Sequence, residues 1–155
     1  MTTVAVHPVP DTSLFLPDLK LKRKESVLHE MACVAQKAGA VRDAELLHET
    51  LLRRERWCPS AVGKGVAVPN ARSLAVTEPR LVIARARRGL EWGASDRVAV
   101  QLVLLVLSTS EMSVDSHLER VMRAIAITRT QRNRLKLLEA EDARIVTALL
   151  REAAL

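Results

Sequence analysis

The residue types in this chain that could do chemistry gather in one segment, residues 51–72, which reads LLRRERWCPSAVGKGVAVPNAR. Guanidinium groups of the kind it contains pair bidentately with phosphate oxygens. Gly63 and Gly65 are equally compatible with simple turns, and charged residues at the end of a helix are most often solvated, so the segment alone does not define a site. A further candidate, His117, lies close to the start of a predicted helix, where the macrodipole favours anions.

The cysteines and the remaining histidines indicate no metal or redox chemistry. Cys33 and Cys58 are far apart in the sequence and form no C-x-x-C pair. His7, His29 and His48 have no metal-ligand spacing. We therefore expect no metal and no cofactor, and two thiols without a disulfide framework favour a reducing, cytoplasmic location.

Length and charge limit the class of protein. A chain of 155 residues that is 48% apolar and 27% charged suits one globular domain. The net charge of +6 and the pI near 10.0 permit an acidic partner or nucleic acid. With Phe15, Trp57 and Trp92 as its only aromatic residues, however, the chain lacks the stacking platform of single-strand binders. Nucleic acid is thus the least favoured partner.

Three basic clusters, residues 20–24, 85–88 and 129–136, are predicted to be solvated faces, with a patch for an acidic protein or phosphates as the alternative. The longest apolar run, residues 98–107, is about half the length that a membrane span requires. Nor does the N-terminal sequence resemble a secretory signal. We expect no membrane segment.

The first half of the chain predicts two helices. Apolar residues recur at helical spacing over residues 24–38, and Gly39 follows as a stop. Asp43 is the expected N-cap of a second helix that ends before Pro59 and buries a leucine face of Leu46, Leu47 and Leu51.

The second half predicts strands and then helices. Residues 63–71 and 80–87 read as strands, and residues 98–107 as a central strand covered on both faces. Helical spacing returns after Ser108, with an apolar face of Leu118, Val121, Met122, Ile125 and Ala126. A last helix is expected over residues 141–153, with Ala143, Val146, Leu149 and Leu150 inward.

These elements predict an α/β domain with a mixed central β-sheet covered by helices on both faces. The prolines Pro8, Pro10 and Pro17 and the lack of periodicity before residue 13 indicate a loose leader over residues 1–12. Residues 13–155 are expected to form the single domain.

Residues 51–72 resemble the segment around the active histidine in the fructose/mannitol-type IIA domains of the bacterial sugar phosphotransferase system. The residues in register are Arg54-Glu55, Pro59-Ser60, Gly63, Gly65 and Val66-Ala67-Val68-Pro69. Later blocks, Leu90-Glu91-Trp92 and Ser116-His117-Leu118, are similar as well, so the resemblance covers roughly residues 14–152. It implies the IIA (mannitol/fructose type) fold, and the length is close to that of the nitrogen-regulatory branch.

The sequence departs from the family at the position of the phosphorylated histidine, where it has Asn70. In the family, a phosphocarrier protein hands its phosphoryl group to that imidazole, which is nucleophilic near neutral pH. A carboxamide nitrogen is not, because its lone pair is delocalised into the carbonyl. The resemblance still places Arg54, Ser60 and the helper histidine His117 around Asn70, as groups that would bind phosphate or a partner.

The resemblance therefore implies a regulatory protein that binds a protein partner through the former phosphohistidine surface. That partner would be a phosphocarrier protein, a kinase or a transporter subunit. The alternative is an active phosphoryl-transfer component, with His117 as acceptor or with Asn70 as an engineered substitution. Whether the chain is an enzyme stays open, although the loss of the acceptor histidine favours a protein without enzymatic activity.

Overall fold

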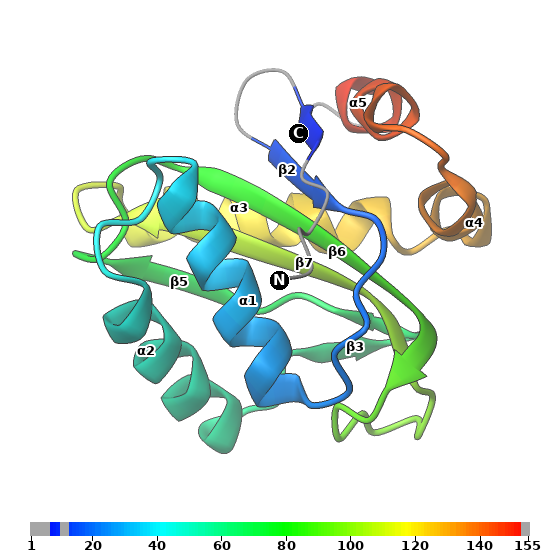
Figure 1. Ribbon diagram of the computed structural model, residues 1–155, viewed down its shortest axis with the longest axis horizontal. Helices are drawn as coiled ribbons and strands as arrows, with labels where there is room; N and C mark the ends of the chain where they lie inside the picture. The colour runs from blue at the N-terminus through cyan, green and yellow to red at the C-terminus, as the bar shows by residue number, and fades with distance from the viewer. Residues whose placement is uncertain (1–6, 10–12, 153–155) are drawn as a thin grey trace.

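A computed structural model describes residues 7–9 and 13–152, which form one mixed sheet with helices on both faces (Figure 1). The strand order is β1-β2-β6-β7-β4-β3, and β5 also pairs with β7. The strands are β1 (His7–Val9), β2 (Ser13–Leu16), β3 (Ala61–Gly63), β4 (Val66–Ala67), β5 (Asn70–Ser73), β6 (Arg80–Leu90) and β7 (Val100–Thr109). The expected fold class is confirmed.

Strand β7 is the centre of the sheet, as its continuous apolar sequence predicts. It pairs antiparallel with β6 on one side and parallel with β4 and then β5 on the other. Val103 and Leu105 point into one core, and Leu102 and Leu104 point into the other. Alternate side chains of a strand point to opposite faces, which explains why nearly every position of β7 is apolar.

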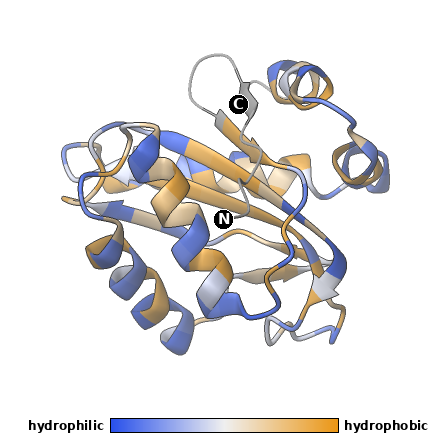
Figure 2. Cartoon of the chain, in the orientation of Figure 1, coloured by the Kyte–Doolittle hydropathy of each residue, from blue (hydrophilic) through white to orange (hydrophobic). Residues whose placement is uncertain are grey.

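Two groups of helices cover the two faces. Helices α1 (Lys24–Lys37) and α2 (Ala44–Trp57) bury their apolar sides in one core. Helices α3 (Val114–Ile127), α4 (Gln131–Glu139) and α5 (Ala143–Glu152) do so in the other. Figure 2 shows the central strands as mostly apolar and the helices as a mixture of apolar and polar residues. This is the pattern of helices that bury one side.

The N-terminal cap of α2 agrees with the sequence. Asp43 has extended backbone angles, and its side chain accepts a hydrogen bond from the backbone nitrogen of Leu46 (3.0 Å). It thereby satisfies one of the amide groups that the first turn leaves free. The leucine face was predicted only in part, because Leu47 and Leu51 are buried whereas Leu46 is 44% exposed.

The buried face of α3 differs from the predicted one. His117, Val121, Ala124 and Ile127 are buried, whereas Leu118 and Met122 are about half exposed. The apolar spacing predicted this face only in part: Val121 is buried and Ile125 packs against the core, but the polar residue His117 also belongs to the buried face. Helix α4 overlaps residues 129–136, which the sequence analysis treated as a basic cluster.

Strand β1 lies within residues 1–12, the region expected to be a loose leader. It pairs antiparallel with β2, which follows that region. The rest of that region lies outside the described residues.

Arg85 corrects the prediction that residues 85–88 form a solvated face. It is buried, and its guanidinium donates hydrogen bonds to the carbonyl oxygens of Pro17, Leu137, Leu138 and Ala140. Only Arg87 and Arg88 of that cluster are exposed.

Candidate functional site

Asn70 lies at the start of β5, next to the middle of β7. Its backbone pairs with Val106, whose amide also donates to the carbonyl oxygen of Pro69 (3.0 Å). The side-chain nitrogen of Asn70 donates to the carbonyl oxygen of Val68 (3.4 Å), which orients the amide oxygen toward α3. The short strand and Pro69 thus fix the position of the carboxamide.

His117 lies in the first turn of α3 and contacts Asn70 directly. The helix begins after Ser113, whose side chain accepts from the backbone nitrogen of Ser116 (3.1 Å). Nε2 of His117 lies 2.9 Å from Oδ1 of Asn70, and Nδ1 lies 2.7 Å from Oγ of Ser108. Because an amide oxygen only accepts, the partners assign the proton to Nε2 of the neutral ring.

Arg120 completes this chain of hydrogen bonds. It follows His117 by three residues and therefore lies on the same side of α3. Its guanidinium donates to Oγ of Ser108 (2.7 Å) and to the carbonyl oxygen of Leu107 (2.6 Å). Ser108 can then donate its hydroxyl proton to Nδ1 of His117. The series of hydrogen bonds therefore runs from Arg120 through Ser108 and His117 to Asn70. No buried polar side-chain atom in the described residues is without a hydrogen-bond partner.

The electrostatic surroundings of His117 favour the neutral form of its ring. Burial lowers its pKa most, and three positive charges lower it further, in the order Arg54, Arg120 and Arg72. Cations gathered around a neutral ring leave the site with an excess of positive charge, which suits an anion. Arg54, an exposed residue near the end of α2, is the one of the three that also lines the hollow beside Asn70.

Ser60 is held in the same hollow by two neighbours. Its backbone nitrogen donates to the carboxylate of the buried Glu55 (3.1 Å), and its hydroxyl accepts from the indole nitrogen of Trp92 (2.9 Å). Glu55 also forms an ion pair with Lys24 (3.1 Å). The Ser60 hydroxyl proton remains available for another acceptor, because the indole only donates.

The hollow has a largely apolar lining around these polar groups. Apolar side chains of its lining come from α2, from β3, from the segment between β4 and β5, and from α3: Leu51, Trp57, Val62, Val68, Val121 and Ile125. Of these side chains, Trp57 is 86% exposed and Val62 is 44% exposed. Exposed apolar groups around polar ones are typical of protein interaction surfaces.

The two glycines of the motif form the turn between β3 and β4. Gly63, Lys64 and Gly65 all have positive φ, at 91°, 60° and 78°. Glycine adopts such angles without steric cost, and the Lys64 amide is held by the side chain of Asp96 (2.8 Å). The turn directs β4 along β7 and thereby sets where Asn70 begins β5.

The four residues singled out from the sequence lie close together around one hollow. Arg54, Ser60 and Asn70 line it, and His117 supports Asn70 from behind. The sequence analysis missed Ser108 and Arg120. The signal for Arg120 was its three-residue spacing from His117 on one helix. Ser108 gave no signal beyond its place at the end of an apolar strand.

Comparison with known proteins identifies relatives of this chain. Residues 9–153 match the family model described as "Phosphoenolpyruvate-dependent sugar phosphotransferase system, EIIA 2". A nitrogen regulatory protein of Bradyrhizobium diazoefficiens is 30% identical over 135 residues, 87% of this chain and 87% of the relative. The fructose-specific EIIABC component of Bacillus subtilis is 31% identical over 125 residues. That match takes in 81% of this chain but only 20% of the much longer relative.

Among solved structures, the nitrogen regulatory protein IIA-Ntr of Neisseria meningitidis has the same fold. Its TM-score is 0.81 at 23% identity, over 88% of this chain and 92% of that one. None of the helices in the described residues is both long and apolar enough to span a membrane.

Proposed function

Since the chain belongs to the EIIA 2 family of the phosphoenolpyruvate-dependent sugar phosphotransferase system, we propose that it is a regulatory IIA-like protein that binds a protein partner through the surface around Asn70. Asn70 takes the position at which the family carries its phosphorylated histidine. The partner is a phosphocarrier protein, a kinase or a transporter subunit. The similarity to nitrogen regulatory proteins supports a regulatory role, and the free thiols of Cys33 and Cys58 support a cytoplasmic location.

The hydrogen bond between Nε2 of His117 and Oδ1 of Asn70 carries this proposal. It supports a site that keeps its second imidazole, its arginine and its hydroxyl but presents an amide where a nucleophile is needed. Such a site hydrogen-bonds an anionic or polar group of a partner and takes up no phosphoryl group. The partner would then meet this surface always in one charge state.

The alternative acceptor, His117, is poorly placed for phosphoryl transfer. It is 4% exposed, and both ring nitrogens already have hydrogen-bond partners. To attack a phosphoryl group, Nε2 would have to lose its proton and leave Asn70. The geometry therefore favours His117 as the residue that positions Asn70.

Phosphoryl uptake from a phosphorylated phosphocarrier protein tests the proposal. The chain itself should stay unlabelled, and Asn70→His should become labelled with one acid-labile phosphoryl group, measured by mass spectrometry. Asn133→His, on α4, is the matched control and should stay unlabelled. Labelling of the unchanged chain that disappears in His117→Ala would overturn the proposal. So would a folded Asn70→His variant that takes up nothing.

Partner binding is tested separately, by NMR titration of the ¹⁵N-labelled chain with the unphosphorylated phosphocarrier. Amide shifts should concentrate around Arg54, Trp57 and Asn70, and Arg54→Ala and Trp57→Ala should weaken binding. Ile145→Ala is the control. It removes an apolar side chain that is 42% exposed on α5, away from this surface, and should leave binding unchanged. Equal affinity in Arg54→Ala, Asn70→Ala and the unchanged chain would exclude this surface.

A further inference from the structure

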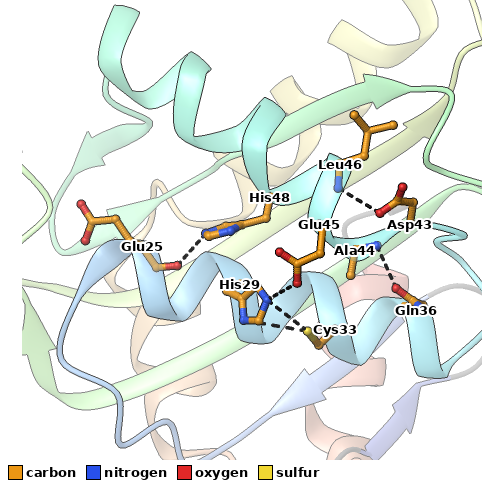
Figure 3. Close-up of polar contacts among 9 residues, drawn as sticks. All are labelled: Glu25, His29, Cys33, Gln36, Asp43, Ala44, Glu45, Leu46 and His48. Atoms are coloured by element: carbon orange, nitrogen blue, oxygen red, sulfur yellow. Dashed lines mark hydrogen bonds and ion pairs between the residues drawn. The ribbon is translucent and has the colours of Figure 1, made fainter.

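Helices α1 and α2 bring together a second group of side chains that the site around Asn70 does not use. His29 and Cys33 lie four residues apart on α1, and Glu45 and His48 lie three apart on α2. Residues at these spacings share one side of a helix. Figure 3 shows the two pairs facing each other across the helix contact.

The donor atoms of this group already lie at short distances. One ligand atom each from His29, Glu45 and His48 falls within 4.8 Å of the others. Nε2 of His29 lies 2.7 Å from Oε1 of Glu45, and the His29 and His48 ring centres lie 4.9 Å apart. The Cys33 sulfur lies 3.7 Å from Nε2 of His29. Nitrogen and sulfur ligands of one tetrahedral zinc ion are separated by roughly 3.5 Å.

We propose that His29, Glu45 and His48 bind a divalent transition metal ion of the Zn²⁺ type, with the Cys33 thiolate as fourth ligand. We call these four residues the α1–α2 site. The metal takes the place of the proton between His29 and Glu45. Two imidazoles, one carboxylate and one thiolate favour Zn²⁺ or Co²⁺ over Ca²⁺ and Mg²⁺, which prefer oxygen ligands.

The orientation of His48 supports this assignment. Its Nε2 lies 2.9 Å from the backbone carbonyl oxygen of Glu25, so this nitrogen is the donor and Nδ1 keeps its lone pair. Histidines that bind metals commonly donate their other ring nitrogen to a carbonyl or carboxylate in this way. A surface ion pair between His29 and Glu45 would not by itself require a ligand atom of His48 beside it, or the Cys33 sulfur against His29.

The position of the group also suits an ion from solution. The His29 side chain is 41% exposed and that of Glu45 is 74% exposed, so little rearrangement is needed for entry. The helix contact is fixed nearby, because the side-chain oxygen of Gln36 accepts from the backbone nitrogen of Ala44 (2.8 Å). Burial, followed by the charges of Glu30 and Glu45, raises the pKa of the Cys33 thiol. Cys33 therefore releases a proton when it binds the metal.

The sequence analysis assigned no metal to these histidines because it sought ligands within one segment. The site is divided between two helices, as H-x-x-x-C and E-x-x-H. Only the packing of α1 on α2 unites the pairs.

Isothermal titration of the tag-free, chelator-treated chain with Zn²⁺ tests the proposal. We expect one ion per chain, and no binding of Ca²⁺ or Mg²⁺. His29→Gln, Glu45→Gln and His48→Gln should each weaken binding at least ~10-fold, which is the lower limit for loss of even an indirect metal contact. Glu49→Gln is the matched control, since it removes the same charge from an exposed position on the same helix. Binding that is absent, or equal in all variants, would overturn the site.

Co²⁺ spectroscopy in a Cys58→Ser background tests the fourth ligand. A sulfur-to-cobalt charge-transfer band that disappears in Cys33→Ser would support it, whereas tetrahedral cobalt bands without that charge transfer would remove Cys33 from the ligand set. Circular dichroism of every variant distinguishes loss of a ligand from loss of the fold. Neither experiment depends on phosphoryl uptake or partner binding.

Discussion

The histidines on the two faces of the sheet differ in how their ring nitrogens are used. On the α3 side, His117 is buried, and both nitrogens are bound to Ser108 and Asn70. On the α1–α2 side, His29 and His48 are only half-buried, and His48 has one nitrogen without a protein partner in the hydrogen bonds described above. The same side chain therefore has two uses. A ring with both nitrogens committed positions its neighbour, and a ring with a free lone pair can bind an ion.

The two groups are connected by α2. Glu45 and His48 lie near its start, and Arg54 and Glu55 lie near its end. The contrast can therefore be tested by changes at one end of α2 that leave the other end intact.

The largest expected effect is that of His117→Ala on stability. The variant leaves Asn70 and Ser108 without their shared partner and creates a cavity, and we expect the free energy of unfolding to fall by about 2–4 kcal/mol. Urea denaturation measures it. His48→Ala, on the other side, should cost less than about 1 kcal/mol. Equal losses of stability in His117→Ala and His48→Ala would contradict the contrast between the two groups of histidines.

The next effect is stabilisation by zinc. At a free concentration 100 times its dissociation constant, Zn²⁺ should raise the free energy of unfolding by about 2.7 kcal/mol, and the melting temperature by about 5–10 °C. Thermal unfolding followed by circular dichroism measures this. His29→Gln should abolish the increase, and His117→Ala should retain it. If His117→Ala removed the stabilisation by zinc, the metal would bind near His117 and not at the α1–α2 site.

A smaller effect is expected from the cap of α2. Asp43→Ala should lower the free energy of unfolding by about 1 kcal/mol, and Asp43→Asn should preserve it, because asparagine also caps helices well. Phosphoryl uptake by Asn70→His should be the same with and without Asp43→Ala. If uptake fell in the double variant, the two ends of α2 would be coupled.

The smallest effect concerns pH. Burial and then Arg54, Arg120 and Arg72 lower the pKa of His117 below its ordinary value of 6.5. Between the lowered pKa and pH 6.5, the unfolded chain binds a proton at His117 that the folded chain does not. The stabilising contribution of the neutral ring is therefore fully present above about pH 6.5 and is lost as the pH drops toward the lowered pKa. Urea midpoints between pH 5 and 7.5 should therefore show a slope that is reduced in His117→Gln. An unchanged slope would mean that His117 is not the group responsible.

The sequence predicted well wherever a residue's role follows from its neighbours in the chain. Continuous apolar residues predicted that β7 is central, and Asp43 was identified as a cap from its place before a helix. Arg54, Ser60, Asn70 and His117 were brought together only through resemblance to a family motif, since no spacing rule relates α3 to β5.

Two of the failures have the same physical cause. Arg85 was assigned to the surface and His117 was left out of the buried face, because each is a polar residue buried by partners distant in sequence. A buried polar group is stable when hydrogen-bonded, and those bonds are tertiary. The residues of the proposed α1–α2 site are likewise distant in sequence, and its two halves meet only when α1 packs on α2.

Arg85 has a consequence for the order in which the chain folds. Its acceptors at Leu137, Leu138 and Ala140 follow it by more than fifty positions, and they terminate α4. Until that helix docks, the guanidinium in the middle of β6 keeps its bond to the carbonyl oxygen of Pro17 but lacks its three other acceptors, which is costly for a buried charge. Pairing of β6 within the sheet and arrival of the C-terminal helices are therefore coupled events. The contacts that couple them span a third of the chain.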